Sequence, residues 1–160
     1  MKELSFKENE LIVSKTDSKG RITYGNDLFI KLSGYTEVEL LGAPHNIIRH
    51  KEMPKLIFKV LWDTIQSGKE INAYVINLAK NGDYYWVYAN VTPSYDSKGN
   101  IIGYYSVRRK PTEDALNIIK PIYKKLVDAE KVGGISKSEA VLKEMLALVG
   151  GRYDKYIISL

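Results

Sequence analysis

Residues 71–109 read INAYVINLAKNGDYYWVYANVTPSYDSKGNIIGYYSVRR and contain three strand candidates separated by two turn signals. The candidates, rich in β-branched and aromatic residues, are Ile71–Leu78, Tyr84–Tyr95 and Ile101–Arg109. Between them lie Asn81-Gly82 and Asp96–Asn100, two sequences that favour tight turns between antiparallel strands. We therefore expect a three-stranded antiparallel meander.

The segment before this meander predicts two further strands and three helices. The strand candidates are Leu11–Asp17 and Ile22–Tyr24, which are joined by a turn-rich stretch. The helix candidates are Asn26–Leu32, Thr36–Leu41, which begins with a capping-box pattern, and Met53–Gln66, which carries apolar residues at helical spacing. The predicted fold class is α+β: a five-stranded antiparallel sheet with short helices and one long helix on one face.

The character of the chain changes after Pro111. Thr112 is a candidate N-cap for a helix that should kink or divide at Pro121 and break at Gly133-Gly134. A second capping-box pattern at Ser136–Glu139 predicts another helix, through Leu148, and residues 156–158 suggest a final strand or apolar anchor. We therefore divide the chain into an N-terminal flank (1–10), an α/β domain (11–110) and a helical C-terminal extension (111–160).

Composition excludes several classes of function. The 160 residues include no cysteine and two histidines, so disulfides, thiolate metal sites and thiol nucleophiles are impossible within this chain. Twenty-four basic residues against 19 acidic ones give a net charge of +5, but they are interspersed and form no nucleic-acid stripe. No apolar run is long enough to enter a membrane, and no acid/base or nucleophilic constellation predicts an enzyme. The expectation is a cytoplasmic, non-enzymatic protein.

Three stretches resemble PAS domains, and the middle one resembles those of aerotaxis receptors in particular. The first runs from Asn26 to Thr36 and continues through Glu39-Leu40 and Gly42. The second is Pro44–His50 with Met53–Lys55, and the third is Asn77–Gly82 followed by Tyr85–Val87 and Ala89-Asn90. The resemblance implies a PAS fold with a sensory domain over residues 11–110 and a signal-transmitting or dimerising extension.

The same resemblance implies a function. PAS domains of aerotaxis receptors bind FAD non-covalently and report its redox state, so the expected function is that of a redox, oxygen or energy sensor. A chain without a membrane span also resembles the soluble half of bipartite energy-taxis systems. The implied partner is a membrane-bound chemotaxis-type receptor or signalling protein, and the chain itself is expected to form a homodimer. FMN, haem on His45 or His50, and a ligand-free interaction module stay open as alternatives.

The resemblance also suggests residues that contact the cofactor. Arg49 offers a rigid donor fork to flavin carbonyls or a pyrophosphate, with His50 beside it, while the family match is the reason to include Asn77. Glu52 stands where aerotaxis receptors usually carry aspartate, which keeps the charge pattern. Structural roles for these residues, as caps or packed side chains, remain the alternative.

Aromatic residues complete the candidate site. Alternation along Tyr84–Tyr95 predicts that Tyr85 faces the pocket together with small Ala89, and that Trp86 lies on the outer face of the sheet. Trp62 and Tyr105 are further candidates for the flavin ring. Ile71 occupies the place of a tryptophan usual in the family, so one stacking contact should be lost.

Overall fold

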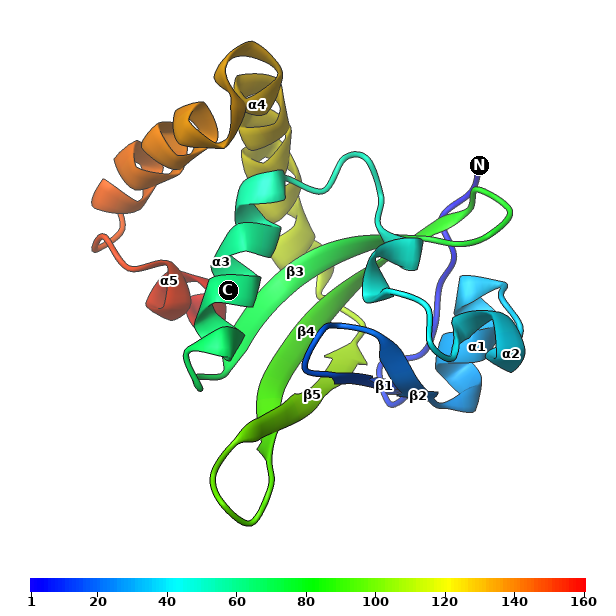
Figure 1. Cartoon of the computed structure of the whole chain (residues 1–160). Coiled ribbons are helices and arrows are strands. Elements are labelled where there is room, and N and C mark those ends of the chain that lie inside the picture. The colour runs from blue at the N-terminus through cyan, green and yellow to red at the C-terminus, as the bar shows by residue number, and fades with distance from the viewer.

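The computed structural model describes residues 1–160, and its centre is an antiparallel sheet in the order β2-β1-β5-β4-β3 (Figure 1). The strands are β1 (Ile12–Asp17), β2 (Ile22–Gly25), β3 (Ile71–Leu78), β4 (Tyr84–Tyr95) and β5 (Ile101–Arg109). All neighbouring strands pair antiparallel, so the predicted meander of β3, β4 and β5 is confirmed. The first two strands join this meander through the β1–β5 pairing.

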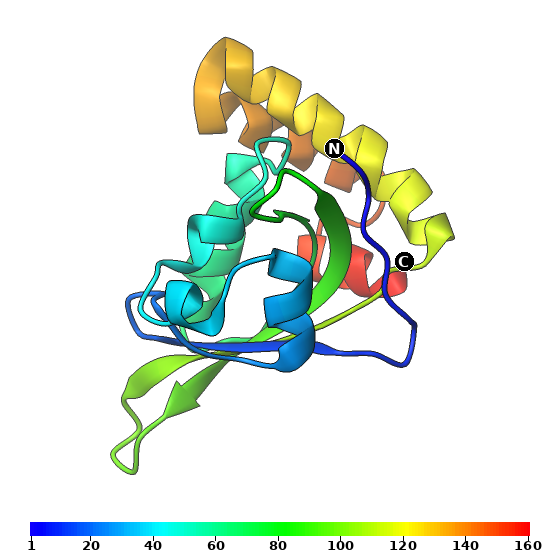
Figure 2. The ribbon, with the colours of Figure 1, turned by 90° about the vertical axis from the view of Figure 1, so that its right-hand side faces the viewer.

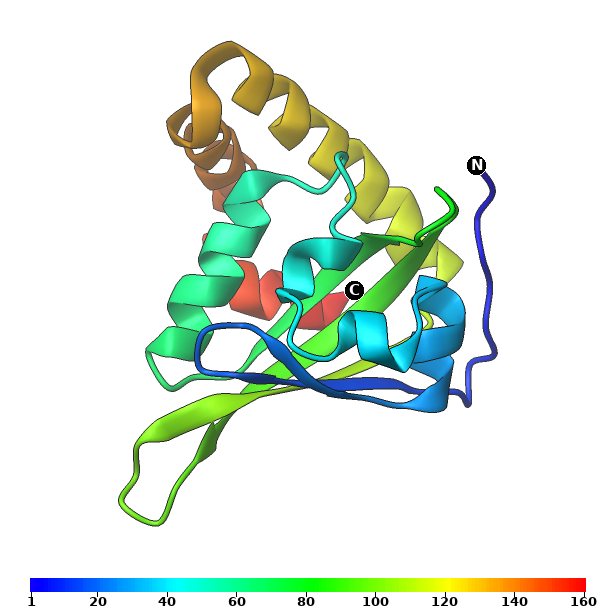
Figure 3. The same cartoon turned by 45° about the vertical axis from the view of Figure 1, so that its right-hand side comes forward.

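The first set of helices lies on one face of the sheet (Figure 3). It comprises α1 (Asp27–Ser33), α2 (Glu37–Leu40), the 3₁₀ turn η1 (His45–Ile48) and α3 (Lys55–Gln66). The longest of these, α3, buries Leu56, Ile57 and Ile65, which lie on its inward side as the apolar spacing predicts. Helix α3 therefore packs against the core of the domain through this apolar side.

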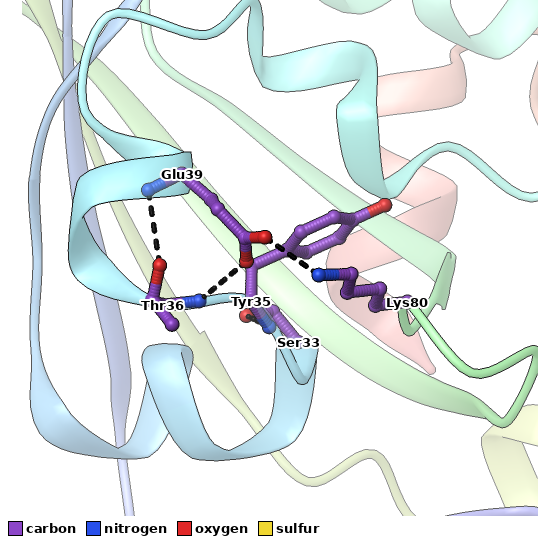
Figure 4. A network of polar contacts seen from close by, with 5 residues as sticks. All are labelled: Ser33, Tyr35, Thr36, Glu39 and Lys80. Carbon is purple, nitrogen blue, oxygen red and sulfur yellow. Dashed lines mark hydrogen bonds and ion pairs between the residues drawn. The ribbon is translucent and has the colours of Figure 1, made fainter.

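A polar network attaches α2 to the hairpin between β3 and β4 (Figure 4). Thr36 Oγ1 accepts a hydrogen bond from the Glu39 N–H at 3.2 Å, and the Glu39 carboxylate accepts from the Thr36 N–H at 2.9 Å. This pair confirms the predicted capping box. The Glu39 carboxylate also receives Lys80 Nζ at 2.6 Å, and that lysine holds the pKa of Glu39 below its usual value.

The C-terminal helices α4 (Glu113–Ala147) and α5 (Tyr153–Ser159) cover part of the opposite face (Figure 2). Thr112 caps α4, since its side chain accepts from the Ala115 N–H at 3.1 Å. The Tyr123 hydroxyl donates to the carbonyl of Tyr74 in β3, and its ring lies 5.9 Å from that of Trp86 in β4. The outer-face position predicted for Trp86 is thus confirmed, and α4 is held to the sheet by a buried tyrosine.

Three expectations for the extension need correction. The helix continues through Pro121, and its single non-helical backbone position is Gly134 (φ 71°, ψ −162°), a conformation that favours glycine. Ser136 is not an N-cap, because helix resumes directly after Gly134 and the Ser136 hydroxyl donates back to the Gly133 carbonyl at 3.3 Å. The terminal segment is the helix α5 and not a strand, with Ile157 buried as its apolar anchor.

The N-terminal flank also packs on the domain. Main-chain hydrogen bonds join Leu4 and Lys2 to Tyr84 at 2.7 and 3.0 Å, and the side chain of Phe6 is buried. No helix combines the length and the hydropathy that crossing a bilayer requires.

The close approach of β1 and β5 generates a stability prediction at Gly103. A Cβ atom there would lie 2.2 Å from the carbonyl oxygen of Thr16, so the strands must separate to admit a methyl group. We expect Gly103→Ala to lower the free energy of unfolding by about 1–3 kcal/mol in urea titrations. The neighbouring Ile102 side chain is 55% exposed, and Ile102→Val is the matched control. Equal stabilities for the two variants would contradict the observed packing.

Candidate functional site

A cavity of about 470 Å³ lies between α3, η1 and the inner face of the sheet. Its volume is within the range of ~300–1,000 Å³ common for small-molecule sites. Much of its wall is apolar and is made by Ile48, Leu61, Val75, Ala89 and Val91. Such walls suit a flat, largely apolar ligand, and the polar groups among them decide which one.

Arg108 places a buried positive charge in this wall. Arg108 is 3% exposed. Its Nη2 donates to Ser14 Oγ at 2.6 Å, and its guanidinium lies 4.8 Å from the centre of the Phe29 ring. No carboxylate pairs with it, and Nε has no hydrogen-bond partner. Burial lowers the pKa of Arg108 to about 10, so the side chain stays charged at neutral pH. A buried, unpaired cation is costly unless a ligand compensates it.

His45 completes the chain of contacts that begins at Arg108. Its Nε2 lies 3.0 Å from Ser14 Oγ, and its ring stacks on Phe29 at 5.9 Å. Burial, assisted by the Arg108 charge, lowers the pKa of His45 to about 3, which makes the imidazole neutral. Because Ser14 accepts from Arg108, its own hydroxyl hydrogen is free to donate to Nε2. The neutral ring then carries its proton on Nδ1.

Asn77 and Tyr85 add two more buried donors. They are directly paired between β3 and β4, and their exposed fractions are 4% and 0%. Neither Asn77 Nδ2 nor the Tyr85 hydroxyl has a hydrogen-bond partner. Burial raises the pKa of Tyr85 to about 12, so the phenol keeps its hydrogen. With Arg108 Nε, three buried donors lack acceptors, and each costs about 1–3 kcal/mol when left unpaired.

The rim of the cavity is cationic and aromatic. Lys19, Arg49 and Lys59 line it, and only Lys59 has an ion-pair partner, Asp63 at 2.8 Å. The guanidinium of Arg49 lies 4.4 Å from the centre of the Phe58 ring. Trp62 faces the cavity from α3, with its ring 5.4 Å from that of Tyr104. The rim therefore leaves two cations free for an anionic group.

The structure brings together part of the predicted site. Arg49, Trp62 and Asn77 line the cavity, and Tyr85 is buried beside Asn77. A backbone bridge between Arg49 and Asn77 holds the loop against β3. His50 does not line the cavity: it packs 5.9 Å from Tyr84, and its Nδ1 accepts from the Glu52 N–H at 3.0 Å. Glu52 itself is exposed outside the cavity.

Tyr105 was predicted on the wrong face of β5. Tyr104, Ser106 and Arg108 line the cavity, so alternation turns Tyr105 to the outer face, where Lys15 Nζ lies 5.6 Å from its ring. Ile71 packs with Ile65, Val91 and Tyr104, and these three line the cavity.

The cavity residues that the sequence prediction missed include Ser14, His45, Tyr104 and Arg108. The sequence suggests a role for His45 only as an alternative haem ligand. A signal for Arg108 did exist, because Ala89, which was predicted to face the pocket, pairs with Arg108 across β4 and β5. Paired residues in an antiparallel sheet share a face.

Comparisons with known proteins agree with this architecture. The chain is 40% identical over 139 residues to the aerotaxis receptor of Escherichia coli K12, covering 87% of this chain and 27% of that protein. It is 28% identical over 97 residues to a nitrogen fixation regulatory protein of Klebsiella pneumoniae, covering 61% and 20%. The chain thus spans about a quarter or less of these relatives.

Solved structures give the same picture. The light-state structure of the Aureochrome1 LOV photoreceptor aligns with a TM-score of 0.60 at 26% identity, over 75% of this chain and 90% of that one. The PAS domain of the fruit-fly ELK potassium channel aligns with a TM-score of 0.57 at 15% identity, over 64% and 87%. A family model described as the PAS fold matches residues 22–108. More than half of the chain lies within that match, including β2, β3, β4 and all of β5 except its last residue. The chain therefore belongs to the PAS family.

Proposed function

We propose that this PAS domain is a redox sensor that binds FAD non-covalently in the cavity between α3 and the sheet. The observation that carries the proposal is the pair of buried donors without acceptors in the cavity wall, Asn77 Nδ2 and Arg108 Nε, with the unpaired Tyr85 hydroxyl buried beside Asn77. The edge of a flavin ring presents carbonyl oxygens and ring nitrogens that accept such bonds. The apolar walls fit the rest of the ring, and a light–oxygen–voltage domain structure that concerns a flavin analogue shares the fold, with a TM-score of 0.60.

The rim supports FAD over the alternatives. Lys19 and Arg49 have no carboxylate partners and suit the phosphates of a dinucleotide, whereas FMN carries only one phosphate. Haem is less well supported, because His45 Nε2 is already engaged by Ser14 and His50 lies outside the cavity. If the domain were a ligand-free interaction module, side chains would fill its interior. The cavity of about 470 Å³ does not support this alternative.

The residues of the chain would translate a redox change into structure. Bound flavin supplies reversible electron and proton uptake. The positive charge of Arg108 in the cavity wall favours negative charge on a bound ligand, and Asn77 orients the ligand through a hydrogen bond. The apolar wall residues exclude water. Because the chain has no cysteine, a cysteinyl adduct is not available, and the proposed signal is a change of redox state.

Similarity to an aerotaxis receptor supports a proposal about the partner. We propose a cytoplasmic, non-enzymatic protein, forming a homodimer, that signals to a membrane-bound chemotaxis-type receptor or signalling protein. The helices α4 and α5 are the transmitting elements of this proposal, because they cover the sheet face opposite the cavity.

Purified protein should be yellow, with a flavin absorption that bleaches on reduction, and mass analysis of the released cofactor should identify FAD. A colourless protein that does not bind added FAD would contradict the proposal.

The sharper prediction concerns Arg108. We expect Arg108→Met to raise the Kd for FAD about tenfold or more, which corresponds to the ~1.5–3 kcal/mol of a hydrogen bond to a charged group. The free energy of unfolding of the ligand-free variant should rise by about 1 kcal/mol, because an unpaired buried charge is removed.

The matched control is Arg109→Met, since Arg109 is exposed and lies over Tyr88 on the outer face, 4.9 Å from the ring centre. Its Kd for FAD should stay at the wild-type value. A purely structural Arg108 would give the opposite pattern, with lower stability and unchanged affinity in Arg108→Met.

A pH prediction follows from His45. Its pKa is about 3 in the folded chain and 6.5 without burial, so the unfolded chain binds more protons between these values. The free energy of unfolding should therefore fall as the pH falls from about 6.5 to 5, by at most ~1.4 kcal/mol per pH unit from this residue. Urea titrations should show a shallower pH slope for His45→Gln, which keeps an acceptor for Ser14. Burial also lowers the pKa of His50, so His50 should account for the pH dependence that remains in this variant. Identical slopes in wild type and His45→Gln would refute the assignment.

A further inference from the structure

The N-terminus of α3 receives its cap from a distant part of the chain. Pro54, the residue before the helix, offers no side-chain cap. Instead the Glu130 carboxylate of α4 accepts the Lys55 N–H on Oε1 at 2.8 Å and the Leu56 N–H on Oε2 at 3.0 Å. Both oxygens are used, and both bonds are made to amides that the helix itself leaves without partners.

This contact joins the two sides of the molecule. The first half of α4 packs on the outer face through Tyr123, then passes the edge of the sheet and reaches α3 with Glu130 (Figure 3). Gly134 bends the helix immediately afterwards, so that its second half continues in a different direction. The Glu130 carboxylate is therefore the polar link between the C-terminal extension and the helix that forms the cavity wall.

The capped end of α3 also leads directly to the cavity. The loop before it contains Arg49, which lines the cavity and is bridged to Asn77. One turn into the helix, Phe58 lies under the Arg49 guanidinium at 4.4 Å, and Trp62 follows on the same wall. A shift of the α3 N-terminus must therefore move groups that face the cavity.

We propose that Glu130 is a positioning residue that couples the C-terminal helix to the cavity wall through the N-terminus of α3. The helix dipole and the two amides favour a carboxylate at this place, so loss of the charge releases both α3 and α4. By linkage, a ligand that orders α3 strengthens the Glu130 contact, and displacement of α4 weakens ligand binding. The coupling is a property of the protein alone, and its use in signalling rests on the proposed function.

The test compares Glu130→Gln and Glu130→Ala with Asp128→Asn in ¹⁵N-labelled protein without added cofactor. Asp128 lies on the same helix and forms only an exposed ion pair with Lys124, at 3.1 Å. We expect the Lys55 and Leu56 amides to exchange hydrogen about fivefold faster in both Glu130 variants, the effect of a lost helix cap. The indole N–H signal of Trp62, assigned with Trp62→Phe, should shift in the same variants, whereas Asp128→Asn should leave both readouts at wild-type values.

Unchanged exchange would overturn the cap, and faster exchange with an unmoved Trp62 signal would overturn the coupling to the cavity. Should Glu130→Ala fail to fold, the isosteric Glu130→Gln decides both readouts. A second arm titrates FAD, and the Kd of Glu130→Gln should rise about fivefold relative to Asp128→Asn. Equal Kd values would also overturn the coupling. A wild-type protein that binds no FAD would refute the proposed function alone, because the exchange and indole readouts need no cofactor.

Discussion

Antiparallel pairing of β3, β4 and β5 places the side chains of paired residues on the same face of the sheet, and the polar side of the cavity depends on this register. Asn77 pairs with Tyr85, and Ala89 pairs with Arg108. The small Ala89 leaves room beside the guanidinium, and the two donors of the first pair lie next to each other. A slip of one residue in β5 that places Val107 opposite Ala89 would remove the charge from the cavity.

The cavity is arranged at a cost to the stability of the ligand-free protein. Arg108 is buried without a carboxylate, and Asn77 and Tyr85 keep donors without acceptors. Burial also keeps His45 neutral, so Arg108 is the one charged group in the buried chain of contacts Arg108–Ser14–His45. Groups in this state are rare in protein interiors unless a ligand satisfies them, and this is why they indicate a binding site more strongly than the cavity volume does.

Helix α4 makes contacts on both sides of the sheet. It is fixed to the outer face by Tyr123 and to the cavity side by Glu130, with the bend at Gly134 following directly. Strand pairing keeps the sheet rigid between these two contacts, whereas a helix cap worth about 1 kcal/mol breaks easily. The weak contact is thus the place where a change in the cavity has the greatest effect on the extension.

Local signals in the sequence were sufficient for the five strands and for α1, α2 and α3, but not for the C-terminal extension. Asn81-Gly82, the Thr36–Glu39 capping box and the apolar spacing of α3 each acted over a few residues, and all are found in the structure. Alternation along β4 placed Trp86 on the outer face, since alternation within one strand needs no knowledge of its neighbours. Asn77, which lines the cavity, was included because of the family resemblance.

Residues whose role depends on partners far along the chain could not be derived this way. Which of Tyr105 and Arg108 faces the cavity depends on how β5 pairs with its neighbours. His45 contacts Ser14, 31 residues away, and Glu130 contacts α3 from a helix that packs on the other face of the sheet. Short-range pattern decides which segments are helices and strands, because those hydrogen bonds form between near neighbours or across tight turns. Packing between distant segments decides which polar groups are buried together, and that juxtaposition makes the site.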